Sequence, residues 1–261
     1  MTGAVQISHA TLAAPRHVNE DLAASGPDWV AVLDGATPLP GVPSGCRHDV
    51  PWLVHGLAAA LGQRLTRPAA AGGADALAGL VAEAIDEVRG AHAGTCDLAN
   101  PDSPSSTLAV VRIRGGRLDY LVLCDSPVLL RRRDGSLTLL ADSRLTAIPR
   151  PRSAAVVAAL RNQPGGFWVA STDPGAAWQT VRGSVPLTDV REAALFSDGV
   201  TRLTEWYGYP WAALLDRLHT GGPAGLIATV RAAERAYPHP RGKQHDDATA
   251  AHLCWALRDD P

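Results

Sequence analysis

Apolar residues recur at helical intervals in two stretches near the start of the chain. Residues 52–65 and 75–89 each carry apolar side chains on one stripe, which predicts two amphipathic helices. Asp75 is expected to be the N-cap of the second helix, and Gly90 is expected to end it. Further helices are predicted over residues 153–161, 211–218 and 226–237.

Short apolar runs bounded by turn residues predict strands along much of the remaining chain. Gly115-Gly116 and Asp134-Gly135 each separate two such runs, and the second pair is a strong hairpin signal. Hairpins with helices inserted in pairs indicate an α+β fold in which sheet packs on sheet and the helices lie outside. A regular strand-helix alternation is absent, which disfavours a doubly wound parallel sheet. The predicted strands cover residues 5–10, 29–33, 107–113, 118–124, 128–132, 137–140, 167–171, 192–196 and 248–255.

Composition excludes several classes of protein. The chain has 261 residues, of which 46% are hydrophobic and 19% charged, and its formal net charge is -2. No stretch has the composition of a linker, so we expect a single packed domain over residues 1–261. Nucleic acid and anionic membranes need a basic surface, so neither is an expected partner. No apolar run approaches the roughly 20 residues that span a bilayer.

The four cysteines, Cys46, Cys96, Cys124 and Cys254, are widely separated in the sequence. They form no C-x-x-C pair and no spacing typical of zinc ligands. Cys124 and Cys254 lie inside apolar runs, so we expect their thiols to be buried. The N-terminus also lacks the pattern of a signal peptide. These features predict a reduced, cytoplasmic setting, and we expect a monomer.

Acidic residues stand beside the apolar strands at five places. A carboxylate at a strand tip lies at the rim of the core, and several tips on one edge would bring repelling charges together. Hard divalent cations such as Mg²⁺ and Mn²⁺ prefer oxygen ligands and relieve that repulsion. Each site taken alone could be a solvated turn, but the five together predict a metal site. They are Glu20-Asp21, Asp34-Gly35, Asp125, Asp198-Gly199 and Asp246-Asp247.

Six short motifs, five of which contain these acids, follow one another between residues 16 and 249. They are Arg16-His17-Val18-Asn19-Glu20-Asp21, Val32-Leu33-Asp34-Gly35, Ser105-Ser106-Thr107-Leu108, Cys124-Asp125-Ser126, Phe196-Ser197-Asp198-Gly199-Val200 and Asp246-Asp247-Ala248-Thr249. In this order they resemble R-x-x-x-E-D, V-x-D-G, G-S-T-A, G-D-S, S-D-G-[LV] and D-[ND]-x-T of the metal-dependent serine/threonine protein phosphatases of type 2C. The chain is similar to a divergent, bacterial-like member of that family.

The resemblance implies a four-layer α-β-β-α fold, in which a central antiparallel β-sandwich is flanked by helix pairs on both sides. It also implies hydrolysis of a phosphoprotein or phosphopeptide by water activated between two Mn²⁺ or Mg²⁺ ions. Arg16 would bind the phosphate, and Asp34 would bridge the two ions. The implied metal ligands are Glu20, Asp21, Asp34, the carbonyl of Gly35, Asp198 and Asp246.

The sequence departs from the family pattern at three places. Ala36 stands where the family usually has a histidine that helps to protonate the leaving oxygen. Arg202 stands where an acid often contributes to a third metal site, and it could pair with Asp125 instead. The first glycines of two motifs are also missing, and Pro127 replaces an arginine.

These departures leave several interpretations open. His48 follows in the same loop as Ala36 and is the candidate replacement acid; alternatively, it caps or packs the helix that begins near Pro51. The whole chain could instead be a pseudophosphatase, which recognises a phosphoprotein without turning it over. A phosphohydrolase of the same fold that acts on a non-protein substrate is a third interpretation.

Overall fold

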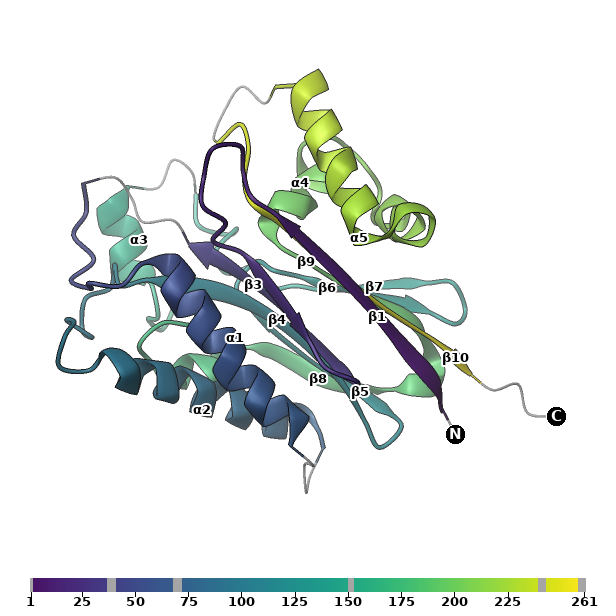
Figure 1. Ribbon diagram of the computed structural model, residues 1–261, viewed down its shortest axis with the longest axis horizontal. Coiled ribbons are helices and arrows are strands. Elements are labelled where there is room, and N and C mark those ends of the chain that lie inside the picture. Colours follow the sequence, from purple (N-terminus) through teal and green to yellow (C-terminus); the bar gives the residue numbers. More distant parts are fainter. Residues whose placement is uncertain (1, 37–40, 68–71, 150–152, 239–242, 258–261) are drawn as a thin grey trace.

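The computed structural model describes residues 2–36, 41–67, 72–149, 153–238 and 243–257 (Figure 1). Two five-stranded antiparallel sheets pack face to face, and helices cover the outer face of each (Figure 1). One sheet has the order β1 (Thr2–Leu12), β10 (Ala248–Leu257), β9 (Val190–Phe196), β6 (Val128–Arg132) and β7 (Leu137–Leu140). The other has the order β2 (Leu22–Ser25), β3 (Trp29–Ala36), β4 (Ser105–Arg114), β5 (Arg117–Leu123) and β8 (Val181–Pro186). The predicted α+β sandwich is therefore confirmed.

Helices α1 (Val50–Thr66) and α2 (Ala74–His92) cover the β2–β8 sheet. On the opposite side α4 (Asp198–Glu205) and α5 (Trp211–Ala236) cover the β1–β7 sheet (Figure 1). The short helix α3 (Ala154–Leu160) and the 3₁₀ helices η1 (Pro174–Gln179) and η2 (Leu187–Asp189) lie in connections. No helix of the described ranges is both long and apolar enough to cross a bilayer.

Burial on both faces explains why the central strands read as continuous apolar runs. In β3, Ala31 and Leu33 pack beneath α1 and α2, whereas Val30 and Val32 face the opposite sheet. Successive side chains of a strand point to opposite faces, so neither face of β3 is left for polar residues. The first acid, Asp34, is therefore placed where the strand reaches the edge of the core.

The predicted helices form with small changes in their ends. Asp49 caps α1 by accepting a hydrogen bond from the backbone N–H of Trp52 at 2.9 Å. The prediction that Asp75 caps α2 is wrong, because the cap position belongs to Gly73, whose φ of 110° suits glycine. The two helices predicted in residues 211–237 are one element with a break at Gly222, which precedes Pro223.

The strand predicted over residues 167–171 does not form. The segment makes only isolated bridges, Ser106 with Ala170 and Arg161 with Phe167. The pattern also missed β2, β8 and α4. Strand β2 has only 4 residues, and the residues of β8 are only partly buried, so neither has a strong apolar signal.

Candidate functional site

Four aspartates from the ends of different strands line one cavity of about 320 Å³. Asp34 lies in the last part of β3, Asp125 follows β5, Asp198 follows β9, and Asp246 precedes β10. The backbone N–H of Asp198 donates to Asp34 Oδ2 at 3.1 Å, which joins the two sheets at this edge. The structure therefore brings these predicted strand-tip acids together.

The carboxylates of these aspartates repel one another at a site that is partly shielded from solvent. Burial raises the pKa of the Asp34 carboxyl well above its usual range, and the charges of Asp21 and Asp198 raise it further. Burial raises the pKa of Asp198 in the same way, with added repulsion from Asp246. Divalent cations that bind carboxylate oxygens relieve both effects, because they stabilise the charged forms. This donor set of oxygens fits hard ions such as Mg²⁺ or Mn²⁺.

Asp21 is the most buried of the predicted metal ligands, with 3% of its surface exposed. Burial raises its pKa to about 7, although hydrogen bonds with Ser197 and Thr249 oppose the shift. Its Oδ2 atom is buried and has no hydrogen-bond partner among the described residues. An unpartnered carboxylate oxygen beside other acids is a further sign that this edge accommodates a cation or its water.

The two glycines that follow the acids are required by close backbone approach. A side chain at Gly35 would place its Cβ 2.5 Å from the carbonyl oxygen of Glu20. A Cβ at Gly199 would lie 1.8 Å from the carbonyl oxygen of Asp247. The Asp247 carboxylate also accepts the backbone N–H of Glu20 at 2.6 Å. The segment that carries Glu20 and Asp21 is thereby held against the strand ends.

Cations already contact one of the predicted metal ligands. Asp246 accepts from Arg202 Nη2 at 3.1 Å and from Lys243 Nζ at 2.9 Å. Arg202 is buried and also pairs with Glu234 at 3.0 Å. The predicted pairing of Arg202 with Asp125 is therefore wrong: α4 directs the guanidinium toward α5 and the segment before β10.

The comparison with known sequences decides the family. The sequence model of the protein phosphatase 2C family matches residues 17–224. The chain belongs to the protein phosphatase 2C family. No curated protein matches the chain significantly in sequence.

Solved structures of phosphatases share this fold. The serine/threonine phosphatase PstP/Ppp of Mycobacterium tuberculosis is 17% identical with a TM-score of 0.65, and the match covers 96% of this chain and 98% of that one. The catalytic domain of PstP in complex with two manganese ions is 17% identical with a TM-score of 0.63, covering 98% and 100%. Stp1 from Staphylococcus aureus is 13% identical with a TM-score of 0.66, covering 97% of each chain.

Two predicted site residues, Arg16 of the first motif and His48 as the candidate replacement acid, do not line the cavity of the aspartates. Arg16 is exposed, has a φ of 67° in a turn, and does not line the cavity. His48 also does not line the cavity; its ring stacks on Trp52 with centroids 3.9 Å apart. These contacts favour the interpretation of His48 as a residue that packs at the start of α1, and its acid role stays a prediction.

Two cations of this phosphatase 2C domain line the cavity without having been predicted. Lys243 lies three positions before Asp246, and its place beside a metal-ligand motif was a usable signal. Arg161 follows α3, and its Nε atom is buried without a hydrogen-bond partner among the described residues. No local pattern marks Arg161, because only the packing of α3 beside the cavity brings it there.

Cys124 occupies the position where the G-D-S motif has glycine. Its φ is 66°, in the left-handed region that favours glycine. The thiol is buried, as predicted, and lines the cavity. Burial raises the pKa of the Cys124 thiol well above its usual range, with a further contribution from Asp125.

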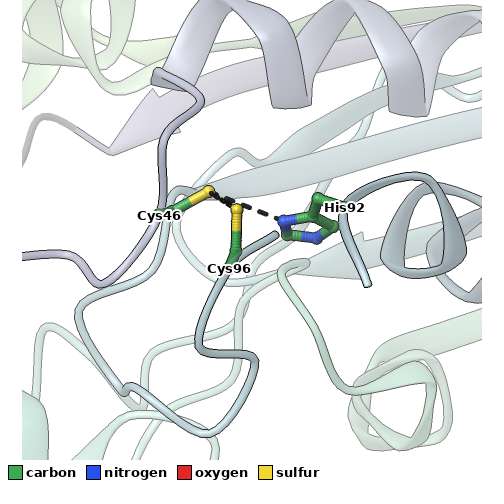
Figure 2. Close-up of side chains that lie close together, drawn as sticks. All are labelled: Cys46, His92 and Cys96. Carbon is green, nitrogen blue, oxygen red and sulfur yellow. Dashed lines mark hydrogen bonds between the residues drawn. The ribbon is translucent and has the colours of Figure 1, made fainter. Parts of the chain in front are cut away.

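The other cysteines depart from the predictions. Cys254 is only half-buried, because its neighbours Leu253 and Trp255 on β10 take the inter-sheet core and leave it on the opposite face. Cys46 and Cys96, although distant in sequence, place their sulfurs 3.1 Å apart (Figure 2). His92 joins this pair, and the three side chains form a group of metal-ligand type that their spacing along the chain did not indicate.

Proposed function

We propose that this phosphatase 2C domain is a metal-dependent hydrolase of phosphoserine and phosphothreonine in proteins or peptides. The supporting observation is the convergence of four aspartates on one cavity, where burial and nearby charges raise the carboxyl pKa values of Asp34 and Asp198. Two divalent cations, Mn²⁺ or Mg²⁺, would be held there. The proposed ligands are Glu20, Asp21, Asp34, the carbonyl of Gly35, Asp198 and Asp246.

Bound divalent cations supply Lewis acidity, which lowers the pKa of coordinated water and stabilises charge on phosphoryl oxygens. The protein's own groups orient this chemistry. The Asp198 amide fixes the Asp34 carboxylate, and the Glu20 segment closes over Gly35. Arg161 and Lys243 line the cavity and offer N–H donors to a phosphate, alongside the proposed role of Arg16.

The cavity also contains a thiol, but it is unsuited to nucleophilic attack. Cys124 has a raised pKa, and the thiolate rather than the thiol is the nucleophile. Ala36 at the cavity wall offers no proton to the leaving oxygen. These two features favour direct attack by water and predict a preference for substrates whose leaving group needs no proton.

The test is hydrolysis of a phosphoserine peptide and of p-nitrophenyl phosphate with and without added metal. Both activities should require Mn²⁺ or Mg²⁺, vanish with a chelator, and return when Mn²⁺ alone is restored. General acid catalysis is typically worth about 10²–10⁴-fold in rate. The nitrophenyl ester should therefore be hydrolysed faster than the peptide by up to that factor. Full activity in excess chelator would contradict the proposal.

One observation favours the alternative of a pseudophosphatase. Both carboxylate oxygens of Asp246 are engaged by cationic side chains, Arg202 and Lys243. These charges compete with a metal ion for the same oxygens. If the protein binds Mn²⁺ and a phosphopeptide but hydrolyses neither substrate, the binding module is the correct function.

Removing the Lys243 charge should strengthen metal binding at Asp246. The ammonium is half-exposed, so the competing pair is worth about 0.2–1 kcal/mol, and Lys243→Met should lower the Kd for Mn²⁺ by roughly 1.4- to fivefold. Isothermal titration calorimetry measures the change. Arg217→Gln removes an exposed charge from α5 away from the cavity and serves as the control. Weaker Mn²⁺ binding in Lys243→Met would show that the ammonium does not compete with the ion.

A further inference from the structure

Cys46, His92 and Cys96 form a compact cluster beside the first helix pair. Cys46 precedes α1, His92 is the last residue of α2, and Cys96 follows four residues later. Cys46 Sγ lies 3.1 Å from Cys96 Sγ and 3.6 Å from His92 Nδ1 (Figure 2). The three ligand atoms all lie within 4.8 Å of one another. Figure 2 shows the sulfurs and the imidazole directed at the same point.

Backbone donors surround the two sulfurs. The N–H of Arg47 donates to Cys96 Sγ at 3.4 Å, and the N–H of His48 donates to Cys46 Sγ at 3.4 Å. Donors of this kind stabilise a thiolate, which is the form of cysteine that binds metals. The His92 side chain is 1% exposed, and burial lowers its pKa, with a smaller contribution from His48. A neutral imidazole is the form that coordinates an ion.

We propose that Cys46, His92 and Cys96 bind a zinc ion, with water as the fourth ligand. Zinc takes thiolate and imidazole ligands in tetrahedral geometry at about 2.3 Å and 2.0–2.1 Å, which places ligand atoms roughly 3.5–3.8 Å apart. The Cys46–His92 separation of 3.6 Å meets that requirement. The two sulfurs, at 3.1 Å, need to separate by about 0.7 Å. Binding releases the thiol protons to solvent.

A disulfide between the same cysteines fits less well. It requires the sulfurs to approach to about 2.0 Å, a displacement of about 1 Å from the observed 3.1 Å. It would also leave the imidazole and the two N–H donors without a charged sulfur to contact. The metal uses all three side chains, whereas the disulfide uses two of them.

A second group of ligand-type residues does not need a metal. Glu192 accepts hydrogen bonds from His252 Nε2 at 2.6 Å and His219 Nε2 at 2.8 Å. Arg131 Nε contacts the same carboxylate at 3.2 Å. Its charge is therefore balanced by the protein itself, which distinguishes it from the cysteine cluster.

The zinc ion would fasten a loop to the end of α2. The loop before α1 already contacts the segment after α2, since Asp97 N–H donates to the Gly45 carbonyl at 2.9 Å and Asn100 Nδ2 to the Pro43 carbonyl at 3.1 Å. That segment leads into β4, whose first residue, Ser105, lines the aspartate cavity. The proposed zinc site would therefore stabilise the structure near the aspartate cavity. Its thiolate and imidazole ligands are softer than the carboxylates of that cavity.

The test measures metal rather than activity. Protein purified with a phosphine reductant and without chelator should contain about one zinc ion per chain, as measured by inductively coupled plasma mass spectrometry. After metal removal, Co²⁺ should produce the thiolate-to-metal charge-transfer band and the strong visible bands of a tetrahedral site. Cys46→Ser and Cys96→Ser should each lose the band, and zinc should no longer raise their Tm.

Two controls separate this site from others. Cys254→Ser removes a half-buried thiol from β10 and should keep the full band. Asp34→Asn removes a cavity carboxylate and should also keep it, so failure of the proposed phosphatase activity does not affect the result. The proposal is overturned if the wild type binds Co²⁺ without a thiolate-to-metal charge-transfer band. It is also overturned if protein purified with the phosphine reductant contains a Cys46–Cys96 disulfide. The wild-type spectrum decides the matter even if a serine variant fails to fold.

Discussion

Asp34→Asn should remove phosphatase turnover while leaving the fold intact. The substitution keeps the shape of the side chain, and the amide oxygen can still accept the Asp198 N–H that now reaches Asp34 Oδ2 at 3.1 Å. It removes the charge proposed to bridge two cations. Loss of one preorganised electrostatic group in an active site costs about 10²–10³-fold in kcat, and a bridging ligand should cost at least that much.

The same substitution should not lower stability in the absence of metal. Burial and the charges of Asp21 and Asp198 raise the pKa of Asp34, so the charged carboxylate is unfavourable there without a cation. Steady-state kinetics with saturating Mn²⁺ measures the activity, and thermal unfolding with and without Mn²⁺ measures the stability. Asp216→Asn, on an exposed part of α5, is the matched control. Wild-type kcat in Asp34→Asn would show that Asp34 is not a metal ligand.

Glu234→Gln should produce the largest loss of stability. The Glu234 side chain has no exposed surface, and it contacts Arg202 at 3.0 Å, Arg231 at 2.9 Å and His245 at 2.7 Å. Glutamine keeps the size but leaves two buried guanidinium groups without their carboxylate. Breaking a buried pair by removing one partner costs about 3–5 kcal/mol, and we expect a loss of unfolding free energy in that range.

Glu234→Gln should also affect the proposed metal site. Arg202 also contacts the Asp246 carboxylate, and Arg231 donates to the Asp246 carbonyl, so both position the segment before β10. Mn²⁺ affinity should fall together with stability in Glu234→Gln. Urea unfolding followed by circular dichroism measures the stability, and isothermal titration calorimetry measures the Mn²⁺ affinity. Glu83→Gln removes an exposed partner of Arg64, which keeps its ion pair with Glu87 at 2.7 Å, and should cost less than about 1 kcal/mol; an equal loss in both variants would contradict the role of Glu234.

Local sequence patterns were sufficient to predict the β-sandwich and many of the residues that line the cavity. Strands buried on both faces are mostly apolar, so β3 and β9 are visible in the sequence, and the acids that end them are visible too. Helix α4 was missed because it has only 8 residues and begins at Asp198, within the motif of the strand-end acid. The partners of Arg202 were missed because guanidinium contacts depend on how α4 and α5 pack.

The family, the order of the motifs and the acids at the strand ends can be recognised from sequence, because these are contiguous patterns of a few residues. The tertiary structure alone decided which distant side chains meet. Cys46, His92 and Cys96 come together because the loop before α1 packs against the end of α2. Their spacing along the chain carries no periodic signal, since the distance between them depends on helix packing rather than on local backbone geometry.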